Sequence, residues 1–269
     1  MALDRVFSPR DWAARLAYAV GLQSGRTVEV ERHLIPVAHP RSGPPLRIAF
    51  ASDFHAGATT DRRVLETACA ALANLKADVL LLGGDFVTVR ASYIRVLAPL
   101  LAEIPAPFGR YAVFGNHDLR ADTSALRAAL SKVDVAVLTN ESVRLRAPHD
   151  DVMIVGLDDP IRGTPDASML DSASGVRIVM MHAPDGLLAL EDREFDLALC
   201  GHTHGGQIVL SPRWIPYLPA GKLSRAYAAG LYRLEPEGRR ALLVSRGVGC
   251  STVPIRVRSP AQVHLVTVG

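Results

Sequence analysis

Five short polar segments, each placed directly after an apolar run, constrain what this chain can fold into. They are Asp53-Phe54-His55, Gly83-Gly84-Asp85, Gly115-Asn116-His117-Asp118, Met181-His182 and Gly201-His202-Thr203-His204-Gly205-Gly206. Each preceding run is predicted to be a β-strand, and an apolar core does not explain the polar residues that follow it. The carboxyl ends of strands in a parallel or mixed sheet share one edge, so the five segments are predicted to converge on one crevice.

Strands and helices alternate along the chain, which is typical of an α/β fold. The run 46–52 predicts a strand, and residues 61–75 predict a helix with Thr60 as N-cap. In the helix predicted at 93–103, Pro99 is expected to produce a kink or to mark the true beginning of the helix. In the helix predicted at 122–131, Thr123 or Asp122 is expected to be the N-cap. Further strands are predicted at 78–82, 111–114, 133–138, 176–181 and 197–200, and further helices at 93–103, 122–131 and 186–190.

The second half of the chain is predicted to add another sheet. Segments 143–146 and 152–157 predict a hairpin, because a polar turn that contains proline separates them. The last third is richer in strand signals than in helical ones, at 208–210, 231–234, 241–245 and 263–268. We therefore expect a second sheet with antiparallel character stacked on the first, in a layered α/β architecture.

The residue types in the five segments are those of a metal centre. Residues two apart in an extended chain project to the same side, so Asp53 with His55, and likewise His202 with His204, can each present a pair of ligands. Carboxylate, imidazole and one asparagine carbonyl suit Mn, Fe or Zn better than Mg or Ca, which prefer all-oxygen ligands. Asp85, a carboxylate at a strand end, is the natural candidate to bridge two cations.

Together the segments resemble the calcineurin-like metallophosphoesterases. That family carries D-x-H, G-D, G-N-H-[D/E], a lone His and G-H-x-H in this order, and the chain has all five between about Leu46 and its C-terminus. The GHTHGGQ form, followed by 245–249 and 254–256, looks most like the bacterial YkuE/YaeI-type branch. The resemblance implies a four-layer α-β-β-α sandwich of two stacked mixed sheets flanked by helices.

The resemblance also implies two metal sites and their ligands. One divalent cation would be held by Asp53, His55, Asp85 and His204, and the other by Asp85, Asn116, His182 and His202. Two cations roughly 3.5 to 4 Å apart share a water whose pKa falls to around neutrality, which gives a hydroxide aimed in line at phosphorus. The expected activity is hydrolysis of a phosphodiester or phosphomonoester with inversion at phosphorus.

Two residues outside the metal ligands receive roles from the same resemblance. His117 would lie beside the scissile phosphate, where it stabilises the transition state or protonates the leaving oxygen, and Asp118 would orient His117. Relatives in this branch often carry an acidic residue after the GDF(V/L) segment, where this chain has Thr88-Val89-Arg90. This departure affects the contacts expected around the site and leaves the metal ligands unaffected.

Two other functions fit the same residues. The first is a pyrophosphatase acting on a nucleotide-linked lipid such as UDP-2,3-diacylglucosamine, motivated by relatives of that activity, the N-terminal amphipathic face described below and the apolar stretch 214–218. That stretch either packs over the sheet or forms a lipid-facing patch. The second is a metal-free scaffold on the same fold. Proteins of that kind usually lose metal ligands, and this chain has lost none.

An N-terminal extension, residues 1–45, precedes the predicted metallophosphoesterase domain, residues 46–269. A helix predicted in this extension has one apolar face, which consists of Trp12, Leu16, Ala19 and Val20. The same segment also carries two arginines, Arg10 and Arg15. The commoner arrangement packs such a stripe on its own domain. The alternative is a helix that lies on a membrane surface.

Composition bears on partners and compartment. The net charge of +3 is mild and spread along the chain, so it gives no support to nucleic-acid binding. The widely separated Cys69, Cys200 and Cys250 indicate neither a disulfide framework nor a zinc motif, which favours a reducing compartment. From the sequence we expect neither a stretch that spans a bilayer nor a signal peptide. We therefore expect a cytoplasmic protein, with peripheral membrane contact as an alternative.

Four polar residues outside the motifs leave two interpretations open. Arg246 and Arg256 either bind substrate phosphate or form surface ion pairs. Asp158 and Asp159 predict a turn that could approach the active site.

Overall fold

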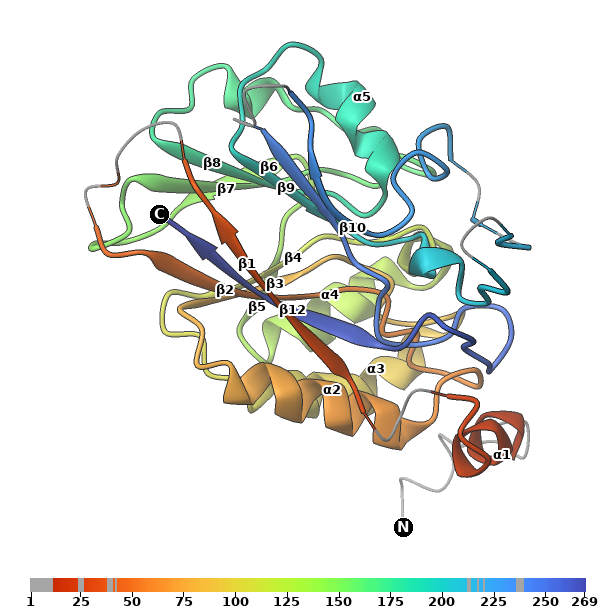
Figure 1. Cartoon of the computed structure of the whole chain (residues 1–269). Helices are drawn as coiled ribbons and strands as arrows, with labels where there is room; N and C mark the ends of the chain where they lie inside the picture. The colour runs from red at the N-terminus through yellow and green to blue at the C-terminus, as the bar shows by residue number, and fades with distance from the viewer. Residues whose placement is uncertain are drawn as a thin grey trace.

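Two six-stranded sheets stack face to face in the computed structural model, with helices on both outer sides (Figure 1). The structure describes residues 12–23, 27–37, 41, 43–211, 214–216, 218–219, 221–235 and 240–269. The layers run from helices through the first sheet and the second sheet to a short helix. The four-layer α-β-β-α sandwich of two mixed sheets is therefore confirmed.

The first sheet has the strand order β1-β12-β2-β3-β4-β5. Its strands are β1 (Glu29–Ile35), β2 (Leu46–Ala51), β3 (Val79–Leu82), β4 (Arg110–Ala112), β5 (Val135–Val137) and β12 (Gln262–Val268). All neighbours in it pair in parallel except β12 and β2, which are antiparallel. Its outer face is covered by α2 (Arg62–Asn74), α3 (Ile94–Ala102) and α4 (Thr123–Ser131).

The second sheet has the strand order β10-β11-β9-β8-β7-β6. Its strands are β6 (Glu141–Arg144), β7 (Val152–Gly156), β8 (Val176–Met180), β9 (Leu197–Cys200), β10 (Gly230–Arg233) and β11 (Ala241–Val244). The outer pairs β6·β7 and β10·β11 are antiparallel, which confirms the predicted hairpin, and the inner pairs are parallel. The short helix α5 (Leu187–Leu190) lies on the outer side of this sheet (Figure 1).

Alternation along β2 shows how one strand serves two layers. Ala49 and Ala51 pack toward the helices, whereas Leu46, Ile48 and Phe50 pack between the sheets. Side chains alternate across a strand, so an uninterrupted apolar run fits a strand that is buried on both faces. This arrangement fixes the position of the strand ends, where the polar segments begin.

Two expectations about the last third of the chain were wrong. Residues 208–210 do not form a strand, since Ile208 makes only an isolated bridge to Val257. Strand β12 joins the first sheet between β1 and β2, and the second sheet instead draws β6 to β9 from the middle of the chain. An apolar run predicts burial but does not identify the neighbouring strand, because the partner is chosen by tertiary packing.

The helix boundaries differ from prediction at two points. Asp61, and not Thr60, is the N-cap of α2, where its carboxylate accepts a hydrogen bond from the backbone N–H of Arg63. The Thr60 hydroxyl instead accepts the N–H of Cys250. Pro99 lies inside α3, which begins at Ile94, so it does not mark the beginning of that helix. Asp122 caps α4, as expected.

The N-terminal helix α1 (Trp12–Ala19) forms, but its apolar stripe faces outward. Trp12, Leu16 and Val20 are 65%, 53% and 60% exposed, while the buried residues of the helix are Ala14 and Ala17. The expectation that the stripe packs on its own domain was therefore wrong, because the two small alanines make the closer contact. Residue 10 lies outside the described residues, and the boundary at residue 45 stays a prediction although β1 belongs to the first sheet.

Among the described residues, no helix combines the length and the apolar character needed to cross a bilayer. The apolar stretch 214–218 does not pack over the sheet as a buried segment. Trp214 is 62% exposed, Ile215 and Leu218 are half-buried, and residue 217 lies outside the described residues.

Candidate metal centre

The five polar segments converge at one edge of the sandwich, as the strand order requires. The first sheet contributes the segments that follow β2, β3 and β4, and the second contributes those that follow β8 and β9. Backbone hydrogen bonds align the segments within the first sheet: the Asp53 N–H donates to Gly84 O (2.8 Å) and the His55 N–H to Asp85 O (2.9 Å). In the second sheet the Gly201 N–H donates to His182 O at 2.9 Å.

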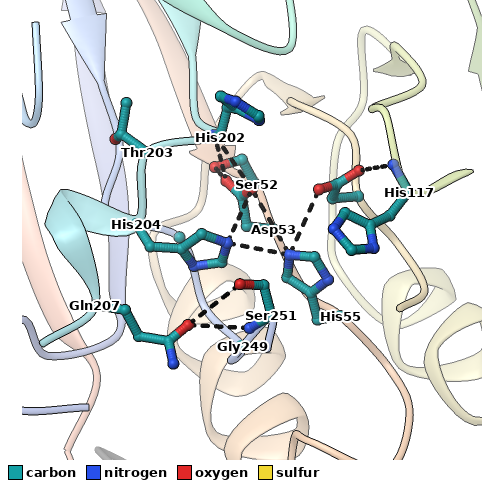
Figure 2. A network of polar contacts seen from close by, with 12 residues as sticks. Ser52, Asp53, His55, His117, His202, Thr203, His204, Gln207, Gly249 and Ser251 are labelled. Atoms are coloured by element: carbon teal, nitrogen blue, oxygen red, sulfur yellow. Dashed lines mark hydrogen bonds and ion pairs between the residues drawn. The ribbon is translucent and has the colours of Figure 1, made fainter. Parts of the chain in front are cut away.

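One group of side chains gathers around His55 and His204 (Figure 2). The two Nε2 atoms lie 3.1 Å apart, and His204 Nε2 is 3.6 Å from Asp53 Oδ1. His55 Nε2 is 3.4 Å from Asp85 Oδ2. These residues are the four that the resemblance assigns to one cation.

A second group gathers around His182. Its Nε2 atom lies 3.3 Å from Asp85 Oδ2, 3.2 Å from Asn116 Oδ1 and 3.3 Å from His202 Nδ1. The other ring nitrogen, Nδ1, is 2.8 Å from the carbonyl oxygen of Gly83, to which it donates when it carries the proton. That hydrogen bond leaves Nε2 unprotonated and directed at the centre, which is the form a metal ligand needs.

Asp85 is the residue that the two groups share. Its Oδ2 atom is in contact with a histidine of each group, His55 on one side and His182 on the other. Its Oδ1 atom accepts the backbone N–H of His117 at 2.8 Å, which fixes the orientation of the carboxylate. A carboxylate held between two clusters of imidazole nitrogens has the arrangement expected of a bridging ligand.

The chemistry of these residues fits divalent cations. Two of the clusters have carboxylate and imidazole atoms within 4.8 Å of one another and consist only of buried residues: Asp53 with His55 and His204, and Asp53 with Asp85 and His182. His55 Nδ1 is buried and has no hydrogen-bond partner within the described part of the chain. Within the described residues, only histidines form ion pairs with the buried carboxylates of Asp53 and Asp85, and two such carboxylates require a compensating positive charge.

The pKa values reflect this crowding. Burial raises the pKa of Asp53 to about 6 and lowers that of His55 to about 3. Burial also acts against the ionised form of Asp85, but the neighbouring His182 outweighs it and holds the Asp85 pKa well below its usual range. Burial lowers the pKa of His182, whereas the neighbouring Asp85 carboxylate raises it. The neighbouring carboxylates, Asp85 foremost, outweigh burial, so the pKa of His182 lies well above its usual value.

Five of the seven predicted ligands have a left-handed backbone. The φ angles are 54° at Asp53, 43° at His55, 54° at Asp85, 70° at His202 and 53° at His204. Non-glycine residues in this region cost about 1 to 3 kcal/mol each when the conformation is strained, and such residues cluster at functional sites. Gly115 explains one close approach: a Cβ atom there would clash with Asp85 Oδ1 and would lie 2.6 Å from His182 Cε1.

The expected contact between Asp118 and His117 is absent. Asp118 Oδ1 accepts the N–H groups of Phe86 (2.9 Å) and Val87 (3.2 Å), and Oδ2 accepts that of Gly115 (3.0 Å). His117 is oriented instead by the backbone carbonyl of Thr88, 2.7 Å from its Nδ1. Asp118 therefore ties two strand ends together, because a buried carboxylate accepts the nearest backbone donors.

A cavity of about 200 Å³ opens onto this centre. Its lining includes five of the residues already described, Asp85, Asn116, His117, His202 and His204. Arg120 and Ile161 also line it, and neither was singled out from the sequence. Arg120 is exposed and lies two positions after the GNHD segment. Its positively charged guanidinium is therefore at the cavity, where a phosphate would enter.

The two arginines considered as phosphate ligands serve other contacts. Arg246 pairs with Glu29 and lies 3.5 Å from Glu31, which confirms the ion-pair interpretation. Arg256 is buried behind His204 and donates to the carbonyl oxygens of Gly249 and Ser259, each at 3.0 Å. Arg256 therefore clamps the loop behind the centre, and backbone carbonyl oxygens and His204 engage its guanidinium.

The remaining expectations about polar residues divide as follows. Asp158 and Asp159 form the predicted turn, in which the carboxylate of Asp159 accepts the N–H of Arg162 at 2.7 Å. The three cysteines are free and buried. A second cluster missed in the sequence joins Glu31, His33 and His264 across β1 and β12. Residue 39 lies outside the described residues.

A fold of this kind, with buried carboxylates and imidazoles at the shared edge of two mixed sheets, defines a metal-dependent phosphoesterase. The model of the calcineurin-like phosphoesterase family matches residues 46–206, and the chain belongs to this family. The predicted family and enzyme class, a metal-dependent phosphoric ester hydrolase, are both confirmed.

The relatives agree with the predicted branch. The chain is 32% identical to phosphodiesterase YaeI of Escherichia coli over 213 residues, which cover 76% of each chain. It is 29% identical to the uncharacterized metallophosphoesterase YkuE of Bacillus subtilis over 250 residues, which cover 89% of this chain and 85% of that protein. The crystal structure of TT1561 of Thermus thermophilus matches 76% of this chain and 91% of its own with a TM-score of 0.50 and 14% identity, which supports the fold alone.

Proposed function

We propose that this chain hydrolyses phosphoesters, phosphodiesters foremost, with two divalent cations held by the predicted ligands. The observation that carries the proposal is the position of Asp85, whose Oδ2 atom lies 3.4 Å from His55 Nε2 and 3.3 Å from His182 Nε2. Mn, Fe or Zn would suit the mixed oxygen and nitrogen donors. When bound, the cations would supply Lewis-acid activation of water and neutralise charge on the phosphoryl oxygens.

The residues around the ligands would orient the substrate and deliver a proton. The carbonyl oxygen of Thr88 accepts a hydrogen bond from Nδ1 of His117 when that atom carries a proton. The Nε2 atom of an imidazolium held in this way would then be available to protonate the leaving oxygen. Arg120 would attract the phosphate into the cavity. The similarity to phosphodiesterase YaeI supports a diester as the substrate class.

The first prediction tests the bridging role. Asp85→Asn is expected to lower the bound metal from two equivalents per chain to one or none and to abolish hydrolysis of bis-p-nitrophenyl phosphate, because the neutral amide is a poor bridge. Elemental analysis and absorbance at the nitrophenolate band measure both. The matched control is Asp192→Asn, which makes the same change at an exposed carboxylate outside the centre.

Two outcomes of that experiment would contradict the proposal. Two equivalents of metal retained in Asp85→Asn would exclude the bridge. Metal near zero in the reconstituted parent would favour the metal-free scaffold.

The narrower function, pyrophosphatase activity on a nucleotide-linked lipid such as UDP-2,3-diacylglucosamine, remains a prediction. It is checked by supplying that lipid in detergent to the reconstituted enzyme and comparing its turnover with that of the aryl diester. A cytoplasmic location with peripheral membrane contact through α1 likewise remains a proposal, supported by the exposed stripe of α1 and the free cysteines.

A further inference from the structure

A second and larger cavity, of about 350 Å³, lies beside the metal centre. It is formed by residues 203, 204 and 206–208, by Pro216 and Pro219, and by residues 251–253 of the loop that precedes β12. The lining that it does not share with the catalytic cavity includes the aliphatic side chains of Ile208 and Val253 and the polar side chains of Thr203 and Gln207. Aliphatic walls recognise a ligand by removing its apolar surface from water.

Two polar side chains of this wall, Gln207 and Thr203, are already engaged within the protein. Gln207 Nε2 donates to the carbonyl oxygens of Val253 (2.8 Å) and Ile255 (2.9 Å), and its Oε1 accepts the N–H of Ser251 (3.0 Å; Figure 2). The Thr203 hydroxyl donates to the carbonyl oxygen of Ala228. These bonds hold the wall in place and engage the polar groups of both side chains within the protein.

The two cavities are adjacent and share part of their walls. His204, Pro219, Ser251 and Thr252 line both of them. A substituent on a phosphoryl group at the metal centre would therefore extend past His204 into the aliphatic cavity. The cavity is within the range of volumes that hold a small-molecule ligand.

We infer that the substrate is a phosphoester that carries an aliphatic chain close to the phosphorus atom, and that this chain binds in the second cavity. The inference rests on the proposed phosphoesterase activity and identifies the class of its substrate. Val253, which lines the cavity and is 39% exposed at its rim, is a specificity-determining residue.

The experiment compares methyl p-nitrophenyl phosphate with hexyl p-nitrophenyl phosphate, each below its critical micelle concentration, with the metal-loaded enzyme. In both, water adds to phosphorus and the bond to p-nitrophenolate breaks, which leaves an alkyl phosphate. The chemistry is the same, and only the chain differs. Burial of methylene groups changes a binding constant by up to about fourfold each, so kcat/KM is expected to be at least about tenfold higher for the hexyl ester.

The variant Val253→Asp places a charge in the cavity and is expected to bring the ratio of the two kcat/KM values close to one. Leu210→Asp is the matched control, because Leu210 is a similarly exposed aliphatic residue (41%) that does not line the cavity, and its ratio is expected to equal that of the parent. Circular dichroism checks folding. If Val253→Asp does not fold, Val253→Ser supplies the same comparison with a smaller expected fall in the ratio.

The outcomes separate the two levels of the argument. Turnover of the methyl ester with no gain for the hexyl ester overturns the aliphatic-chain inference and leaves the proposed function standing. Turnover of neither ester by the metal-loaded enzyme overturns the proposed function itself. A hexyl preference that Val253→Asp and Val253→Ser both leave unchanged also overturns the inference, because the chain would then bind elsewhere.

Discussion

His117 differs from the other four histidines of the motifs in what its ring contacts. One nitrogen is engaged by the carbonyl oxygen of Thr88, and the ring meets that of His55 edge-on with centroids 4.8 Å apart. The other four have a ring nitrogen directed at carboxylate, amide or imidazole atoms of the centre. His117 also has a ring nitrogen within 4.8 Å of ligand atoms of His55 and Asp85, so its hydrogen bond to the Thr88 carbonyl is what sets it apart from the other four.

The prediction at this scale concerns that separation. His117→Ala is expected to lower kcat for an aryl diester by about 10²- to 10⁴-fold, the usual contribution of a positioned acid or base. Metal content measured by elemental analysis should remain that of the parent. Loss of metal together with activity would instead make His117 a ligand.

At the scale of single elements, α1 is unusual because it exposes its large apolar side chains and buries its small ones. Its residues Trp12 and Leu16, with Val20 just beyond its end, lie four apart and so form one exposed stripe. The helix contacts the body through small alanines, and Arg63 lies over the Tyr18 ring at 3.9 Å. The arrangement fixes the helix while its large apolar side chains remain in solvent.

We expect this stripe to bind lipid. The full chain should co-sediment with phosphatidylglycerol vesicles, and Leu16→Asp should weaken that binding, because a buried charge opposes insertion of the apolar face. The control is Leu188→Asp on α5, a 52% exposed leucine at the opposite end of the molecule (Figure 1). Equal binding by the two variants would contradict a role for α1.

At the scale of the whole molecule, the first sheet joins the N-terminal β1 to the C-terminal β12, and a pair formed by the half-buried His33 and the buried His264 lies at that junction. His33 Nε2 is 3.2 Å from His264 Nδ1 and 3.5 Å from Glu31 Oε2. Burial lowers the pKa of His264 to about 3, and His33 and Arg246 act in the same direction. The folded chain therefore keeps His264 neutral well below pH 6.5.

This junction predicts how stability depends on pH. Between about pH 6.5 and 3 the unfolded chain binds a proton at His264 that the folded chain does not, so the free energy of unfolding falls as the pH is lowered. One such group contributes up to about 1.4 kcal/mol per pH unit. His264→Gln should reduce that slope in urea unfolding of metal-free protein at pH 7, 6 and 5. An unchanged slope would show that His264 titrates normally.

Local patterns were sufficient for most elements and for the residues of the centre. The apolar runs placed eleven of the twelve strands, all but β1, and the polar segments after five of them identified the residues that meet around Asp85. Short-range pattern failed where a contact came from a distant part of the chain. The Thr88 carbonyl that orients His117 and the N-cap choice at Asp61 are examples.

The sequence by itself determined which side chains end the strands and which chemistry they can perform, because period-2 alternation and glycine-flanked ligands are local properties. Only the tertiary structure decided that β12 returns to the first sheet, that Asp118 ties backbone and not His117, and that an aliphatic cavity adjoins the centre. Each of these depends on which distant segments pack together. Packing is a property of the whole chain, so no local window contains it.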